Sequence, residues 1–377
     1  MSLDGETVAQ PTACSAPLCP ARPFELDHNT RLLPSSNESL QPSHNLHTSL
    51  IARSNYQAIA DNGVRMQTHS FGDYTFTPAS VFPSVAAASG PGTPEWHYII
   101  VTTKALPDRT DDSKLIAPLV GANSCIVLIQ NGVGVEDPYR KRFPSTPIVS
   151  AVTVISAEQV SPGTIRQNRW TRVHLGPYTD SASSTTTPPS ASAEAHGQQH
   201  ALLEQQGTAR TAALADWWSR LGGIRDAEPT DEVGLQTVRW HKLCINSAFN
   251  PSAVLSGGRG NADMARDPEL RAHLAGVMDE LREAAPRVLG RAFPEGLAGP
   301  ERILRSTERN VGGRPSMLLD WEAGRPLEIE VILGNPVRIA RAKGVELPRM
   351  QTLYALLRSM QLMREAERKE TTGKGKL

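Results

Sequence analysis

Tyr98-Ile99-Ile100-Val101 and Cys125-Ile126-Val127-Leu128-Ile129 are the two stretches that decide the fold. Each is an unbroken apolar run of strand length, which is typical of a strand buried on both faces of a parallel sheet. A helical stretch from Ser113 to Leu119 separates them. This alternation of strand, helix and strand predicts an α/β domain.

Strand-length apolar segments of this kind begin near Leu46. Short strand candidates cover 48–52, 64–67 and 73–77. Residues 1–45 are rich in Pro and Ser without an apolar period, so we expect a disordered or atypical N-terminus. Nine of the ten residues in 181–190 are Ser, Thr or Pro. We therefore interpret 180–206 as a low-complexity insertion that forms a mobile surface loop.

The second half reads as mainly helical from Thr230 onward. A helix over 212–221 and a short strand over 224–227 come before it, and helical periods run through 270–289, 328–343 and 350–363. The sequence predicts an α/β domain over 46–229, a mainly helical domain over 230–366, and a disordered tail over 367–377.

Composition excludes several functional classes. The 377 residues carry 39 Lys plus Arg and 39 Asp plus Glu, so no net field favours nucleic acid or an acidic membrane surface. No apolar run approaches the roughly 18 residues of a membrane span. The first 45 residues lack the apolar core of a signal peptide, and we expect a cytoplasmic protein. Four cysteines without paired spacing predict neither a disulfide framework nor a metal site.

The most informative polar motif is Lys242, Asn246 and Asn250, which recur every four residues. On a helix the three side chains share one face. A lysine with two carboxamides is suited to donate a proton and to hold a small polar ligand. A solvated polar stripe is the other interpretation, although Asn is a poor residue for a helix interior.

Two further segments end in polar residues. Ser316 and Asp320 precede Glu328, where a hydroxyl and a carboxylate are suited to bind a small polar molecule, although an N-cap and an exposed acid would look the same. Lys104 and Asn131 follow the two strands quoted above. The carboxyl ends of parallel strands are where α/β domains place ligands, which makes both residues candidates for a cofactor crevice.

Together these motifs resemble the ketopantoate reductase (2-dehydropantoate 2-reductase) family from about Thr48 to about Leu357. Six motifs occur in the order and spacing of that family: Leu50-Ile51-Ala52-Arg53, Val101-Thr102-Thr103-Lys104-Ala105, Gln130-Asn131-Gly132, the Lys242/Asn246/Asn250 helix, Pro315-Ser316-Met317 with Asp320, and Glu328-Ile329-Glu330 with Gly334.

The resemblance implies a Rossmann-type domain that binds NADPH, a helical C-terminal domain that closes over the substrate, and a monomer or homodimer. It implies reduction of a small 2-oxo acid, 2-dehydropantoate first of all, as in pantothenate biosynthesis. Lys242 would be the general acid that protonates the ketone oxygen. Asn246, Asn250 and Ser316 would bind the hydroxyl and carboxylate of the substrate.

For the cofactor, the resemblance implies that Lys104 and Asn131 line the NADPH crevice. Glu328 would lie near the nicotinamide ribose. Arg53, at the end of the second strand of such a domain, would pair with the 2′-phosphate.

One feature of the family is missing. Its first strand and Gly-x-Gly-x-x-Gly turn have no counterpart, because no glycine occurs between Gly5 and Gly63. That strand lies at the centre of a Rossmann sheet, so its absence predicts two unpaired strand edges. Either a normal loop belongs to the natural N-terminus and is lost here, or the chain is a degenerate, catalytically silent relative that acts as a binding protein. A related hydroxyacid dehydrogenase is a third alternative.

Overall fold

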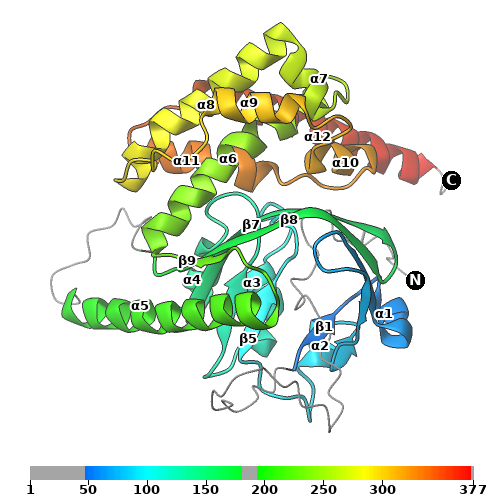
Figure 1. Cartoon of the computed structure of the whole chain (residues 1–377), viewed down its shortest axis with the longest axis vertical. Coiled ribbons are helices and arrows are strands. Elements are labelled where there is room, and N and C mark those ends of the chain that lie inside the picture. The colour runs from blue at the N-terminus through cyan, green and yellow to red at the C-terminus, as the bar shows by residue number, and fades with distance from the viewer. Residues whose placement is uncertain (1–46, 181–192, 375–377) are drawn as a thin grey trace, which may run out of the picture.

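The computed structural model describes residues 47–180 and 193–374, which form a sheet part and a helical part joined by one long helix (Figure 1). The elements of the sheet part, in chain order, are β1 (Ser49–Ile51), α1 (Tyr56–Asn62), β2 (Val64–Thr68), β3 (Tyr74–Phe76), β4 (Ser80–Phe82), α2 (Val85–Ala88), β5 (Tyr98–Val101), α3 (Asp112–Ile116), η1 (Ala117–Leu119), β6 (Cys125–Leu128), α4 (Asp137–Arg142), β7 (Ile148–Ser161), β8 (Thr164–Pro177), α5 (Ala193–Asp216), η2 (Trp217–Leu221) and β9 (Ala227–Pro229).

The main sheet has the strand order β3-β2-β8-β7-β6-β5, with β9 beside β8. β5, β6 and β7 are parallel, as the apolar runs predict. Every residue of β6 is buried. Cys125 and Val127 pack with Leu214 and Trp218, whereas Ile126 packs on the opposite face with α3 and α4. Both faces of this sheet are therefore covered, which explains the lack of polar alternation along β6.

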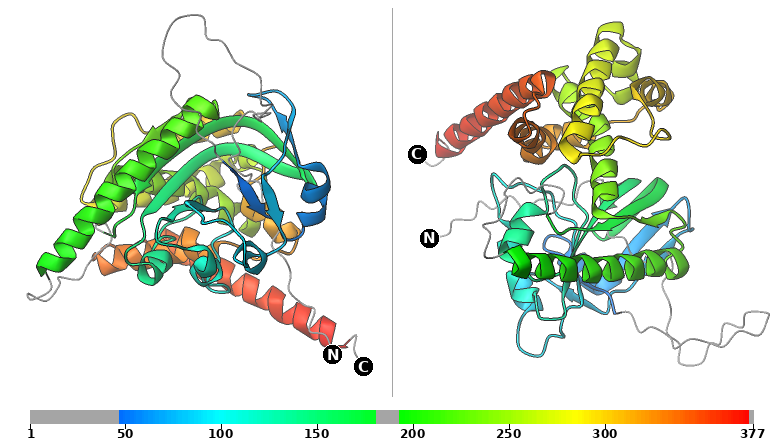
Figure 2. Two further views of the ribbon diagram at one scale, coloured as in Figure 1. Left: turned by 90° about the horizontal axis from the view of Figure 1, so that it is seen from below. Right: turned by 90° about the vertical axis from the view of Figure 1, so that its left-hand side faces the viewer.

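β7 and β8 are antiparallel strands of 14 residues each, and they curve across the sheet part (Figure 2). Their register shifts between Ile155 and Ala157 and again between Gln159 and Ser161. Such irregularities increase the local twist of a strand pair. β2 pairs in parallel with the first residues of β8, Thr164 to Gln167. The hairpin of β7 and β8 therefore carries β2 and β3 at one edge of the sheet.

β1 and β4 form a separate parallel pair in which Ser49 lies opposite Ser80. Among the described residues β1 pairs only with β4 and β5 only with β6, so each leaves one edge without a strand partner. Within residues 47–180, these are the two edges that the sequence predicts to lack a partner. Ile51 on β1 and Ile100 on β5 are correspondingly 41% and 43% exposed.

Three local predictions were wrong in extent. Residues 193–206, expected within a mobile loop, belong to α5, whose Ala, Gln, Glu and Leu residues are strong helix formers. Residues 367–374, expected to be disordered, continue the last helix, α12 (Pro348–Lys374). The strand expected at 224–227 is β9, which begins at Ala227. The predictions for residues 1–45, 181–192 and 375–377 lie outside the described residues.

The helical part follows α6 (Glu232–Leu255), which rises out of the sheet part (Figure 2). Its other elements are α7 (Asn261–Arg266), α8 (Pro268–Leu289), α9 (Pro300–Glu308), α10 (Ser316–Glu322), η3 (Glu330–Gly334), α11 (Asn335–Ala342) and α12. The architecture is thus a Rossmann-like sheet domain followed by a helical C-terminal domain, as predicted.

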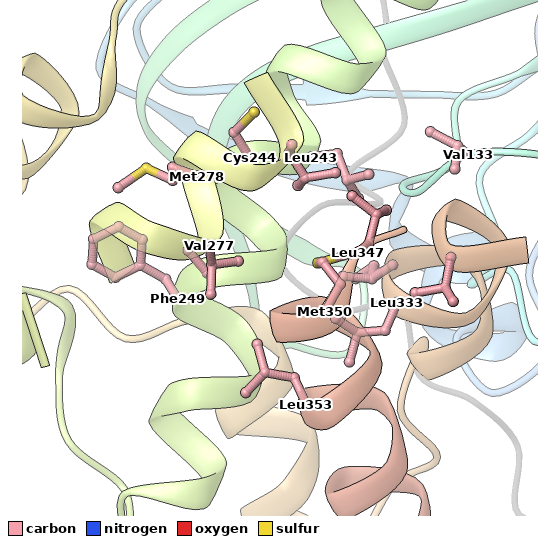
Figure 3. Packing of buried hydrophobic residues seen from close by; sticks show 14 of the residues in the cluster. Val133, Leu243, Cys244, Phe249, Val277, Met278, Leu333, Leu347, Met350 and Leu353 are labelled. Atoms are coloured by element: carbon pink, nitrogen blue, oxygen red, sulfur yellow. The ribbon is translucent and has the colours of Figure 1, made fainter. Parts of the chain in front are cut away.

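One hydrophobic core spans the helical part and reaches into the sheet part. On α8, Leu274, Val277, Met278 and Leu281 are fully buried at helical spacing. Figure 3 shows Val277 and Met278 beside Leu243 and Phe249 of α6, with Val133 at the margin of the cluster. Because Val133 belongs to the loop after β6, this core holds that loop against the helical part. No helix in the described residues is long and apolar enough to cross a membrane.

Candidate active site

Helix α6 carries the predicted Lys242, Asn246 and Asn250. The helix begins after Asp231, whose Oδ1 accepts a hydrogen bond of 2.6 Å from the backbone N–H of Gly234. That bond satisfies one of the free N–H groups of the first turn. The 24 residues of α6 then extend from the edge of the sheet into the helical core, which places its middle at the boundary between the two parts.

A small cavity lies at this boundary. It is lined by Gln130, Asn131, Gly132, Val152, Arg239, Lys242, Leu243 and Asn246. The Lys242 ammonium donates a hydrogen bond of 2.8 Å to Oδ1 of Asn131. Lys242 and Asn246 of α6 therefore share the face that the four-residue spacing predicted, and the strand end that carries Asn131 meets them.

The loop after β6 depends on a glycine. Gly132 has φ +85°, and a Cβ at this position would lie 2.4 Å from the carbonyl oxygen of Val331 in η3. The next residue, Val133, donates its N–H to the same oxygen at 3.0 Å. Close approach of the two backbones thus requires glycine directly after Asn131. Gln130, on the other side, donates 3.0 Å to the carbonyl of Thr103 and ties the ends of β5 and β6 together.

A buried charged cluster lies next to Asn131. Lys104, after β5, forms an ion pair with Asp320 of α10, and their side chains are 6% and 4% exposed. Arg325 Nε lies 2.9 Å from the other carboxylate oxygen of Asp320. Glu328 Oε1 accepts a bond of 3.2 Å from the N–H of Ala105. Lys104, predicted to line a cofactor crevice, forms its ion pair here with a carboxylate from the helical part.

Burial raises the pKa of Glu328, and the nearby Lys104 ammonium, the Ala105 N–H and a hydrogen bond from Asn131 oppose this rise. Asn131 therefore contacts both Lys242 and Glu328. A neutral amide between an ammonium and a carboxylate can accept from the first and donate to the second. The side chain of Asn131 links the cavity to the charged cluster.

The other predicted residues do not line the cavity. Asn250 is buried one turn further along α6 and is not among the residues that line the cavity. Ser316 is the first residue of α10, and the alternative interpretation of Ser316 as an N-cap is wrong, because the cap position is Pro315 and no side chain caps this helix. Arg53 is exposed in the turn after β1, and β1 belongs to the two-stranded sheet rather than to the main sheet, whose strands β5 and β6 precede Lys104 and Asn131.

Sequence reasoning missed Gln236 and Arg239, which are buried on α6 before Lys242. They lie six and three residues before Lys242, and residues three apart are neighbours on a helix surface. The four-residue spacing of Lys242 and Asn246 leads back to Val238 and Gly234 instead, so that spacing gave no signal for them. Val152, on β7, also lines the cavity, but an ordinary strand valine gives no signal of such a role.

The described residues fit one half of a dinucleotide. Asn131, after β6, and Lys242, on α6, line a small cavity, and Glu328 hydrogen-bonds to Asn131. These are donors and acceptors of the kind that the reactive end of a nicotinamide cofactor and its substrate require. For the phosphates, residues 47–180 and 193–374 offer no glycine-rich turn between a strand and a helix beside β1. No group of His, Cys, Asp and Glu within the described ranges is arranged to hold a metal ion.

Comparison with known proteins agrees with the division of the chain into a sheet part and a helical part. Residues 39–180 match the family model "Ketopantoate reductase PanE/ApbA", and residues 234–361 match "Ketopantoate reductase PanE/ApbA C terminal". The boundary between the matches falls where α6 begins. Fold, site and matches together define an oxidoreductase. The chain belongs to the ketopantoate reductase family.

Individual relatives are similar over most of their length. The crystal structure of 2-dehydropantoate 2-reductase from Methylococcus capsulatus has a TM-score of 0.66 and 30% identity, covering 84% of this chain and 89% of that one. A 2-dehydropantoate 2-reductase of Nostoc is 25% identical over 82% of this chain and 86% of its own. An uncharacterised protein of Saccharomyces cerevisiae is 27% identical over 86% of this chain and 88% of its own length.

Proposed function

We propose that this chain is an NADPH-dependent reductase of a small 2-oxo acid, with 2-dehydropantoate as the first candidate substrate and pantoate as its product. The observation that carries the proposal is the contact between Lys242 and Asn131 at a cavity formed by α6 and the carboxyl end of β6. The names of the Methylococcus and Nostoc relatives support the choice of substrate.

Lys242 acts as the general acid. When NADPH is bound, it supplies the hydride that the carbonyl carbon accepts. Negative charge then grows on the ketone oxygen, and the Lys242 ammonium both stabilises this charge and donates the proton that completes the hydroxyl. The neutral amine left behind takes a proton from solvent before the next turnover. Asn131 orients the ammonium by accepting a hydrogen bond from one of its three N–H groups.

The remaining residues hold the substrate. Asn246 lines the cavity on the same side as Lys242 and is placed to bind a hydroxyl or carboxylate oxygen. Leu243 and Val152 provide apolar surface for a short aliphatic chain. In this proposal Asn250 and Ser316 complete the substrate site, and Glu328 lies beside the nicotinamide ribose.

The test combines binding with product analysis. The full 377-residue chain is titrated with NADPH by calorimetry and then incubated with NADPH and a panel of 2-oxo acids that includes 2-dehydropantoate and larger aromatic members. Pantoate formation faster than reduction of the aromatic acids supports the proposal. A preference for another 2-oxo acid would indicate a related hydroxyacid dehydrogenase.

The missing glycine turn motivates one alternative, a catalytically silent relative that serves as a binding protein. It predicts a folded chain, shown by circular dichroism, that binds no NADPH and reduces no member of the panel. Binding in the micromolar range with turnover would exclude it.

A further inference from the structure

A second buried ion pair lies at the cavity, which its arginine, Arg239, lines. Arg239 Nε is 3.1 Å from Glu136 Oε1, and the two side chains are 2% and 1% exposed. Neither residue contributes to the proton donation described above. Burying two charges is costly unless further hydrogen bonds satisfy both groups, and both residues make such bonds.

The guanidinium of Arg239 holds the loop that carries Asn131. Its Nη1 donates to the carbonyl oxygens of Gln130 and Gly132, each at 2.8 Å. Gln130 and Gly132 are the residues directly before and after Asn131. Its Nη2 donates to Ser150 Oγ at 2.5 Å and approaches the carbonyl of Ala151 at 3.4 Å. One side chain thus fixes the loop after β6 against the start of β7.

Glu136 holds Arg239 in place. Its Oε1 accepts bonds from Ser150 Oγ at 2.6 Å and from Gln236 Nε2 at 3.1 Å. Gln236 and Arg239 lie on α6, and Arg239 is three residues before Lys242. Helix α6 therefore carries both Lys242 and Arg239, the residue that holds the loop of Asn131, to which Lys242 donates a hydrogen bond.

We propose that Arg239, fixed by Glu136, is a positioning residue that sets the place of Asn131 relative to Lys242 and Glu328. The inference rests on the proposed function for its catalytic consequence. Gly132 leaves the turn without the steric restriction that a side chain would impose, so the position of Asn131 depends on contacts from outside the turn. A lysine at position 239 keeps the charge beside Glu136 but lacks the planar fork that reaches two carbonyls at once.

The first test is Arg239→Lys with Arg140→Lys as its matched control. Arg140 is also partly buried and donates to backbone carbonyls of the sheet part, those of Phe143, Thr146 and Tyr178, but it does not line the cavity. We expect R239K to lower kcat for the 2-oxo acid by roughly 10- to 100-fold with KM changed by less than about threefold. R140K leaves both values unchanged.

A double-mutant cycle tests whether Arg239 acts through Asn131. In Asn131→Ala the residue to be positioned is gone, so adding R239K has no further effect on kcat. Multiplied losses in the double variant would overturn the proposal. Should R239K fail to fold, Arg239→Met with Glu136→Gln removes both charges without leaving either unpaired, and the same loss of kcat is expected.

A readout without turnover separates this proposal from the proposed function. The rate at which acetic anhydride acetylates Lys242, measured by peptide mass spectrometry, rises several-fold when Asn131 no longer holds the ammonium. We expect the same rise in R239K, N131A and the double variant, and none in R140K. If R239K matches the unmodified chain while N131A does not, Arg239 has no positioning role, whatever the chain's activity.

Discussion

Substitution of Gly132 by alanine tests the contact that joins the loop after β6 to η3. Gly132 has φ +85°, and an added Cβ would lie 2.4 Å from the Val331 oxygen and 2.5 Å from the Val331 Cβ. A left-handed conformation costs a residue with a Cβ roughly 1–2 kcal/mol. Forcing an extra methyl group into a packed contact adds about 1–3 kcal/mol, because backbone rather than a flexible side chain must shift.

Gly92→Ala is the matched control. Gly92 has φ +83°, and no atom lies within 4 Å of the position that its Cβ would occupy. This variant therefore carries the conformational cost of roughly 1–2 kcal/mol without the overlap. The difference between the two variants isolates the contact with Val331, and we expect G132A to be the less stable by about 1–3 kcal/mol.

Urea denaturation followed by circular dichroism measures both variants, provided that their m values agree with that of the unmodified chain. The G132A variant should also lose turnover, because Asn131 moves with the loop, whereas G92A should not. Equal destabilisation of the two variants, within about 0.5 kcal/mol, would show that the close approach of Gly132 to Val331 does not exist in solution.

Three further predictions concern buried charge and capping. Burial raises the pKa of Glu328, so the folded state binds its proton at pH values where the unfolded state has lost it, and stability falls as pH rises above the ordinary glutamate range. Glu328→Gln removes this slope, and its gain in melting temperature should grow as the pH rises above that range, while activity falls; a gain independent of pH would contradict the assignment. Lys104→Met leaves Asp320 and Glu328 without the ammonium and should cost about 3–5 kcal/mol in the free energy of unfolding, part of which Asp320→Asn restores in the double variant; additive losses would argue against the pair. Asp231→Ala removes the N-cap of α6 and should cost about 0.5–2 kcal/mol by urea denaturation, with Asp231→Asn near the unmodified value.

The fold could be predicted where local pattern and burial agree. β6 was identifiable because both of its faces are covered, so no polar residue interrupts the apolar run. β5 was identifiable from a similar apolar run, although Ile100 within it is exposed. The helix α6 was identifiable because the lysine and asparagine spacing coincides with an apolar face. The 14-residue strands β7 and β8 were not, because their outer halves are half-exposed and polar residues dilute the alternation.

The site was predictable only in part, for a physical reason. Lys242, Asn246 and Asn131 were identified because each belongs to a local motif. The pairing of Lys104 with Asp320 joins residues more than 200 positions apart, and no local pattern specifies which carboxylate a buried lysine meets. Arg239 was missed because an arginine on a helix usually indicates a solvated face, whereas here three elements bury it.

The most direct test of the account is the rate of pantoate formation from 2-dehydropantoate by the full chain and by Lys242→Ala, at saturating NADPH. The account predicts that the alanine variant binds NADPH as the unmodified chain does but reduces the ketone roughly 10²- to 10⁴-fold more slowly, the usual contribution of a general acid. Equal rates for the two proteins would contradict the role of Lys242. A folded, NADPH-binding chain that forms no pantoate would contradict the proposed reaction itself.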